Sequence, residues 1–174
     1  MTALPSSFSG RCKRALKHAS TTARAARQVF PTATLRAIEE AIAHGEEIHS
    51  AEVRLIIEPA LGLEAAFKNV SNRERAVALF AQYGIWDTEE NCGVLIYINL
   101  AERQVDIVAD RNVGRRIGAP EWQAICQTMT QGFANGDYHN STLAALNTLN
   151  DLLSRHFPPR DGRPNQLPNA AIVI

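Results

Sequence analysis

The fold is decided by one stretch of sequence, residues 93–110, which reads GVLIYINLAERQVDIVAD. Its first part, Val94–Ile98, is uninterrupted apolar sequence and predicts a strand that is buried on both faces of a sheet. Its second part, Arg103–Asp110, alternates between apolar and polar residues, which is typical of a second strand. Only Ala101 and Glu102 separate the two strands, so we expect them to form an antiparallel hairpin.

Elements on either side of this hairpin extend the prediction. Residues 52–58 are rich in β-branched side chains and end at Pro59, which indicates a strand. The segment from Ser71 to Gly84 has the pattern of a capped helix, with Glu74 at the capping-box position. A helix between two strands favours a parallel pair through a right-handed crossover. Three further helices are expected, at 35–45 with Gly45 at its end, at 120–136 and at 138–156. Trp122 leads the apolar face of the second of these helices and should be largely buried. The predicted fold class is α/β, a three-layer α/β/α sandwich with a small mixed central sheet.

Composition divides the chain into three parts. Residues 1–30 hold six basic and no acidic side chains, and their apolar residues, mostly alanine, follow a single helical stripe from Cys12 to Phe30. We therefore expect a basic N-terminal helical segment (1–30), an α/β domain (31–158) and an extended C-terminal tail (159–174). The tail is rich in proline and should be poorly ordered. Its apolar end, residues 170–174, makes strand addition to a sheet edge the alternative.

Charge and hydropathy exclude several classes of protein. The longest aliphatic or aromatic run, Val94–Ile98, is far shorter than the ~20 residues of a membrane span, and no apolar signal-peptide core precedes it. The expected location is the cytoplasm, with attachment to the inner membrane as an alternative. Three cysteines without C-x-x-C spacing argue against a disulfide framework and a structural zinc site.

The basic N-terminal segment suggests a partner of opposite charge. It carries a local charge of +6, and the remaining 144 residues carry −6. An anionic membrane surface could bind residues 11–27, and a basic helix packed on its own acidic domain is the simpler alternative. No aromatic side chain lies among these basic residues, so we expect no nucleic-acid partner.

The acidic segment before the first hairpin strand is the strongest candidate site. Asp87, Glu89 and Asn91 occupy alternate positions, as at the start of a calcium-binding loop. The EF-hand pattern then fails, because the glycine comes one residue late and the twelfth position is Ile98 rather than glutamate. The expected hairpin register places Gly93 opposite Asp110, which brings this segment to the loop of residues 110–112 that follows the second strand. A parallel first strand would also bring Glu52 there.

These oxygen-bearing side chains have two interpretations. Clustered carboxylates repel one another unless a cation or an arginine compensates them, so a hard divalent cation is one interpretation. The other is a solvated acidic loop, in which Asp87 or Thr88 makes turn hydrogen bonds and Asp110 pairs with Arg111.

The sequence from Arg75 to Pro158 resembles the TPM-domain family, most clearly in WDTEENCGVLIYINLAERQVDIVADRNVG, Trp122 and the closing HFP of residues 156–158. The resemblance implies an α/β/α sandwich. It also implies calcium binding or acid phosphatase activity, as described for some members, with Asp87, Glu89, Asn91 and Asp110 as candidate metal-binding positions. Many relatives have asparagine where this chain has Cys92, and a thiol is a poor ligand for a hard cation. Many are also exported or membrane-anchored, and we expect neither here.

Three functions follow as hypotheses. The first is a non-catalytic module that binds a divalent cation, calcium, weakly and acts through a protein partner. The second is a metal-assisted phosphatase, for which Arg111, Arg115 and Arg116 would bind the phosphate, although no nucleophile–base pair can be named. The third is a peripheral membrane protein held by the basic N-terminal helix.

Overall fold

A computed structural model describes residues 8–159 and 165–174 of the chain. Within these residues, the elements in chain order are α1 (Phe8–Ser20), α2 (Ala23–Val29), α3 (Thr32–Ile48), β1 (Glu52–Glu58), α4 (Leu63–Phe67), α5 (Asn72–Gln82), β2 (Gly93–Asn99), β3 (Gln104–Ala109), α6 (Arg111–Arg116), α7 (Ala119–Ala134), α8 (Tyr138–His156) and β4 (Ile172–Val173).

One mixed sheet, with strand order β3-β2-β1-β4, forms the centre of the molecule. Strand β1 is parallel to β2, with Glu52 beside Gly93. Strands β2 and β3 are antiparallel, with Val94 opposite Ala109. Both pairings and the hairpin register agree with the sequence prediction, and all seven residues of β2 are buried as expected.

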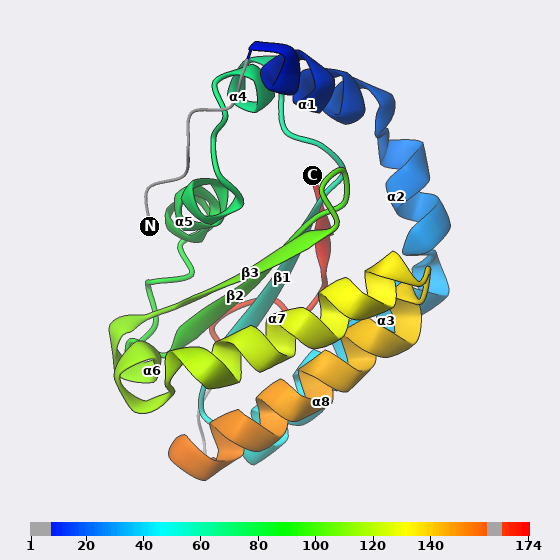
Figure 1. Cartoon of the computed structure of the whole chain (residues 1–174). Coiled ribbons are helices and arrows are strands. Elements are labelled where there is room, and N and C mark those ends of the chain that lie inside the picture. The colour runs from blue at the N-terminus through cyan, green and yellow to red at the C-terminus, as the bar shows by residue number, and fades with distance from the viewer. Residues whose placement is uncertain (1–7, 160–164) are drawn as a thin grey trace.

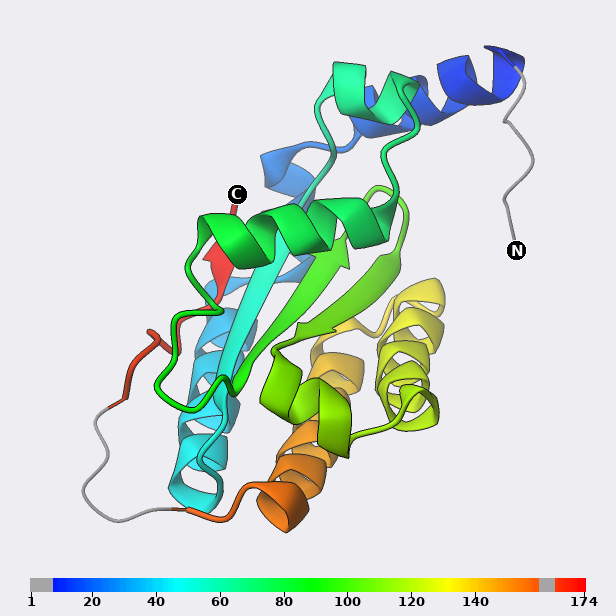
Figure 2. The same ribbon diagram turned by 90° about the vertical axis from the view of Figure 1, so that its left-hand side faces the viewer.

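Helices cover both faces of this sheet, which confirms the three-layer α/β/α architecture (Figures 1 and 2). Helices α3, α7 and α8 lie on one face, over alternate strand residues such as Leu55, Ile96 and Ile107. Helix α5 lies on the other face, where Ala76 and Leu79 pack on a set that comprises Ile56, Leu95, Tyr97 and Val108. The α5 capping box is present as predicted, with Ser71 and Glu74 bonding reciprocally.

The N-terminal segment is two helices instead of the single one predicted. Helix α1 ends at Ser20, where the hydroxyls of Ser20 and Thr21 both donate to the carbonyl oxygen of Lys17. Thr22 then caps α2 by accepting from the backbone N–H of Ala25. Local side-chain hydrogen bonds of this kind compete with the backbone hydrogen bonds of a helix. They break the helix here, although the apolar stripe continues across the break.

Helix α1 packs on α4 and the hairpin turn at one end of the molecule (Figure 1). Arg14 of α1 forms an ion pair with Glu102, and His18 also contacts this carboxylate, at 3.0 Å. The basic N-terminal helix thus contacts an acidic group of its own domain, which was the simpler alternative at the sequence level.

Three further sequence predictions need correction. The residues after Asp110 form helix α6 instead of a loop, since Asp110 serves as its N-cap. Gly45 lies inside α3 instead of ending it. Glycine is needed here for packing, because a Cβ at this position would overlap the side chain of Asn150 on α8, and the absence of a Cβ allows the two helices to approach. Trp122, expected to be largely buried, is only half-buried at the margin of the core.

The C-terminal residues lie against the sheet. Ile172 and Val173 form β4, parallel to β1, and the N–H of Ile174 donates to the carbonyl oxygen of Ile57. Strand addition is therefore the outcome for the apolar end of the tail. The part of the predicted tail at 160–164 lies outside the described residues.

No helix in the described part of the chain combines the length and the apolar character that crossing a bilayer requires.

Candidate functional site

The acidic loop before β2 and the start of α6 meet at one end of the sheet, as the hairpin register predicted. The N–H of Asp110 donates to the carbonyl oxygen of Gly93, at 2.9 Å. Asn112 joins the two segments, because its backbone N–H donates to Asn91 O (3.2 Å) and its side-chain amide to Glu90 O (3.0 Å). The candidate residues thus come from two chain segments that are hydrogen-bonded to each other.

Asp110 is the buried member of the candidate set. One carboxylate oxygen, Oδ1, accepts from the backbone N–H of Arg111 at 2.6 Å. The other, Oδ2, is buried and has no hydrogen-bond partner among the described residues. A buried, unpartnered carboxylate oxygen is costly, so this atom needs a further donor or a cation.

The other candidate residues are exposed. Asp87, Glu89 and Asn91 all lie on the surface of the loop, and Asn91 adopts a left-handed conformation with φ of 52°. The loop is held by its backbone and by Thr88, whose hydroxyl accepts from the N–H of Cys92 at 2.9 Å. Among residues 8–159 and 165–174, no three His, Cys, Asp or Glu side chains are grouped so that they could hold a metal ion.

Two neighbouring groups have partners within the protein. The Glu52 carboxylate accepts from the backbone N–H groups of Gln166 and Leu167, and the latter bond is 3.1 Å long. The Cys92 thiol is buried and donates to the carbonyl oxygen of Ser50. The oxygen donors that remain, from Asp110 and the 87–91 loop, are the hard ligands that calcium and magnesium prefer.

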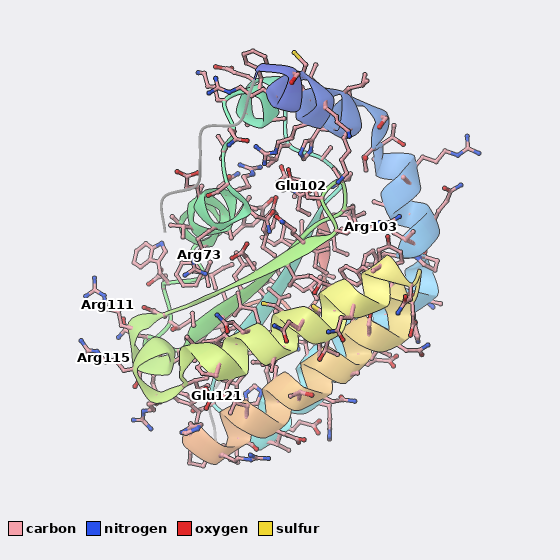
Figure 3. The ribbon with its side chains drawn as sticks, in the orientation of Figure 1. Arg73, Glu102, Arg103, Arg111, Arg115 and Glu121 are labelled. Atoms are coloured by element: carbon pink, nitrogen blue, oxygen red, sulfur yellow. The ribbon has the colours of Figure 1, made fainter. Side chains whose placement is uncertain are left out.

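The arginines considered for phosphate binding diverge. Arg111 and Arg115 are exposed and project from α6 at this end of the sheet (Figure 3). Arg116 instead donates to the carbonyl oxygen of His156 and lies over the ring of Phe157, 5.0 Å from its centroid. The three do not form one phosphate-binding cluster.

Two contacts at this site were missed at the sequence level. Gln166 accepts from the N–H of Glu89 at 3.1 Å, which ties the C-terminal segment to the acidic loop. Nothing in the local pattern indicates this contact, because the two residues are 77 positions apart. The bridging role of Asn112 was also missed, although its position two residues after Asp110 was a usable signal.

The fold and the paired loops define a class of α/β/α sandwich domains. A family model described as the TPM domain matches residues 24–152, well over half of the chain. The protein therefore belongs to the TPM-domain family.

The fold is also similar to a solved structure, the NMR structure of BA42 protein from the psychrophilic bacterium Bizionia argentinensis. The TM-score is 0.72 at 20% sequence identity, and the likeness covers 82% of this chain and 93% of that one. At this identity the likeness establishes the fold alone. The curated proteins contain no match to this chain.

Proposed function

We propose that this TPM domain is a non-catalytic module that binds a divalent cation, calcium, weakly and acts through a protein partner. The observation that carries the proposal is the buried Oδ2 of Asp110, which lacks a hydrogen-bond partner among the described residues. A cation beside this oxygen would compensate its charge. Asp110 would be the anchoring ligand.

The remaining ligands would come from the adjacent loop. Asp87, Glu89 and Asn91 are exposed on it, so their side chains can turn toward Asp110 at little packing cost. Backbone carbonyls and water would complete the six to eight oxygens that calcium takes. With only one ligand fixed beforehand, we expect a dissociation constant on the order of 10⁻⁴–10⁻³ M.

A calcium titration of the full chain tests this proposal. Calcium at about ten times its dissociation constant should stabilise the folded state by about 1.4 kcal/mol, measured as a rise in Tm relative to chelator. Asp110→Asn should abolish the rise. The metal-free Tm should be equal to or above that of the wild type, because asparagine is as good an N-cap as aspartate and carries no charge that needs compensation.

Asp137→Asn is the matched control. Asp137 also caps a helix, by accepting from the N–H of Asn140, but it is exposed and begins α8. The Asp137→Asn variant should show the same rise in Tm with calcium as the wild type. A wild-type protein whose Tm is the same in calcium and chelator would refute the proposal, as would an Asp110→Asn variant that still responds.

A further inference from the structure

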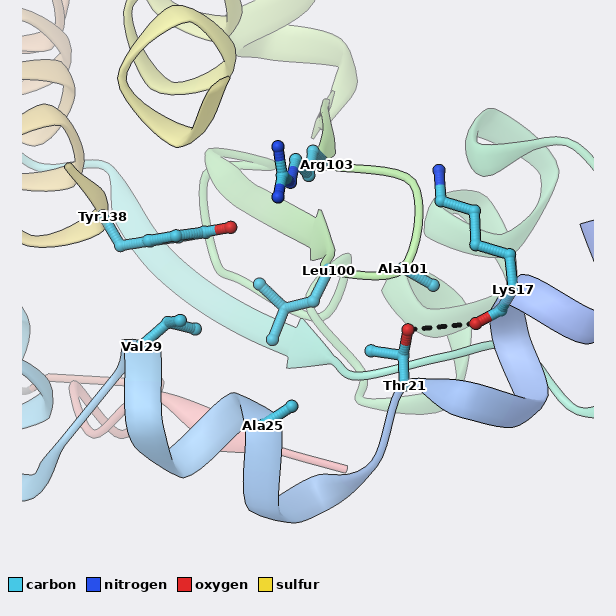
Figure 4. A pocket seen from close by; sticks show the side chains of 8 residues that line it. All are labelled: Lys17, Thr21, Ala25, Val29, Leu100, Ala101, Arg103 and Tyr138. Atoms are coloured by element: carbon cyan, nitrogen blue, oxygen red, sulfur yellow. Dashed lines mark hydrogen bonds between the residues drawn. The ribbon is translucent and has the colours of Figure 1, made fainter. Parts of the chain in front are cut away.

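A pocket of about 430 Å³ lies at the end of the hairpin opposite to Asp110. Its walls come from both helices of the N-terminal segment, from the β2–β3 turn and from the first residue of α8 (Figure 4). The lining residues are Lys17, Thr21, Ala25, Val29, Leu100, Ala101, Arg103 and Tyr138. The volume lies within the range of small-molecule sites.

Both charged residues of this pocket are cationic. Lys17 and Arg103 are exposed, and neither side chain has an ion-pair or hydrogen-bond partner in the described part of the chain. The neighbouring carboxylate, Glu102, is bound instead to Arg14 and His18 of α1. The pocket therefore keeps two uncompensated positive charges.

The turn that closes the β2–β3 hairpin positions the Arg103 side chain. Arg103 has φ of 52°, a left-handed conformation that arginine seldom adopts and that asparagine or glycine tolerates better. Short hairpin loops commonly place one left-handed residue at this point, and the Arg103 N–H closes the turn by donating to Leu100 O at 3.1 Å. The turn places the guanidinium group at the pocket that Tyr138 also lines (Figure 4).

Tyr138 is the third polar group, and its ring is fixed by packing. The ring stacks on Phe133 with centroids 4.7 Å apart and meets Phe30 edge-on at 5.7 Å. The hydroxyl reaches toward the pocket and has no hydrogen-bond partner among residues 8–159 and 165–174. It is a preorganised donor for an acceptor group on a ligand.

The rest of the wall is apolar. Leu100 and Ala101 form a buried surface from the hairpin turn, and Ala25 and Val29 face it from α2. This space exists because the N-terminal segment breaks after Ser20, so α1 and α2 wrap around the turn from two sides.

We propose that this pocket binds a small organic anion whose carboxylate or phosphate head group is attached to a short apolar body. Lys17, Arg103 and the Tyr138 hydroxyl would bind the head group, and Ala25, Val29 and Leu100 would contact the body. The same chemistry occurs in free short-chain acids and in anionic lipids. The site is independent of the cation proposal, because about 20 Å of strand separates the two ends of β2.

Octanoate is the first probe, added to the full chain and followed through backbone amide shifts. Saturable shifts should appear at Thr21, Ala25, Val29, Leu100 and Ala101. Octanol, which has the same chain without the charge, should not reproduce them at equal concentration. The double variant Lys17→Gln, Arg103→Asn should weaken octanoate binding about tenfold or more.

The variants are chosen to preserve the fold. Both residues are exposed, and asparagine tolerates the left-handed backbone of position 103. Lys13→Gln is the matched control, because Lys13 is an exposed lysine one turn earlier on α1 that does not line the pocket. The Lys13→Gln variant should bind octanoate with the affinity of the wild type.

Phosphatidylglycerol vesicles distinguish the two sources of the anion. Binding of octanoate and vesicles, both lost in the double variant, would support the pocket with lipid as the source. Binding of octanoate alone would support it with a free acid as the source. No saturable shift with octanoate, or equal affinity in the wild type and the double variant, would overturn the proposal. Vesicle binding without octanoate binding would overturn it too, since membrane attachment would then bypass the pocket.

Discussion

Gly93, the first residue of β2, is fixed by its neighbours. A Cβ at this position would overlap the carbonyl oxygen of Ile85, a backbone atom that a rotamer change cannot move. Gly93→Ala should therefore force the segment before β2 away from the sheet. We expect a loss of about 3 kcal/mol or more in the free energy of unfolding, measured by urea titration.

Gly114 provides the comparison for this substitution. It lies in α6, and the nearest atom that an added Cβ would meet, the carbonyl oxygen of Ala109, is 3.9 Å away. Gly114→Ala should be neutral or stabilising by up to about 1 kcal/mol, since alanine favours helix. Equal losses in the two variants would show that close approach is not what selects glycine at position 93.

Glu46, on the face of α3 near the C-terminal segment, makes the stability depend on pH. Its burial, reinforced by the negative charge of Glu52 and opposed by a hydrogen bond with Asn169, raises its pKa from 4.5 to about 7. The folded state therefore binds the proton more tightly than the unfolded state, and this side chain lowers stability as the pH rises from about 4.5 to about 7.

Glu46→Gln should remove that dependence. At pH 8 we expect the variant to be more stable than the wild type by about 1 kcal/mol, a value reduced from the full pKa shift because the side chain is half-exposed. At pH 5 the difference should shrink, because Glu46 is then protonated in the folded wild type. Denaturant titrations of both proteins at the two pH values measure it, and a difference independent of pH would contradict the prediction.

At the scale of elements, one carboxylate anchors α1. Burial of Glu102 opposes its ionisation, but the hydrogen bonds from Arg14 and His18, together with the positive charge of Arg14, outweigh this and hold the pKa of Glu102 below its usual 4.5. The stabilisation of the folded state by ionised Glu102 is therefore present above pH 4.5 and is lost as the pH falls below it. Arg14 also donates to the carbonyl oxygen of Val70, at 2.8 Å.

Glu102→Gln should loosen α1 without unfolding the sheet. Hydrogen bonds to charged groups contribute about 1.5–3 kcal/mol, so amide protection in α1 at pH 7 should fall by about tenfold or more. Protection in β2 should stay unchanged. The control is Glu40→Gln, at an exposed position of α3, which should alter amide protection in neither α1 nor β2. Unchanged protection of α1 in Glu102→Gln would show that Glu102 does not anchor this helix.

The elements also show where sequence reasoning succeeds. The β2–β3 hairpin was predictable with its register because the apolar pattern, the turn and the partner strand lie within eighteen residues, 93–110. The break between α1 and α2 was not predictable, because it depends on side-chain hydrogen bonds of Ser20, Thr21 and Thr22, and the apolar periodicity gives no sign of them. Helix α6 was missed for a similar reason, since six residues with an internal glycine carry little helical pattern.

The candidate site was predictable in its position but not in its detailed contacts. The register alone brings the 87–91 loop to Asp110, and the structure has the two segments hydrogen-bonded through Asn112. The unpartnered oxygen of Asp110 was not predictable, because it depends on which groups happen to face a buried atom. The pocket at Lys17 and Arg103 could not be predicted either, since it requires the unforeseen helix break.

At the scale of the whole molecule, β4 pairs with Ile56 and Ile57 at an edge of the sheet that would otherwise be open there. Exposed strand edges are templates for pairing between chains. Removal of residues 170–174 should therefore lower Tm and produce concentration-dependent association, because the outer edge of β1 loses its partner. Size-exclusion chromatography over a range of concentrations measures this.

A substitution that keeps the backbone provides the control for this truncation. Ile174→Ser leaves the chain length and the N–H that donates to Ile57 O in place. This variant should show the same concentration dependence in size-exclusion chromatography as the full chain. A truncated protein that stays unassociated and melts at the wild-type temperature would mean that β4 does not protect the edge.

The pairing of β4 with β1 also has a consequence for synthesis on the ribosome. Ile56 and its partner Ile172 are 116 positions apart in the chain. At ~5–20 residues per second, roughly 6–23 seconds pass between the addition of the first and the addition of the second. Throughout that interval the outer edge of β1 has no strand to close it, although β2 can already pair on the other side. The nascent chain is thus most exposed to contacts with its polysome neighbours during this interval, and an early-binding chaperone would have this edge as its target.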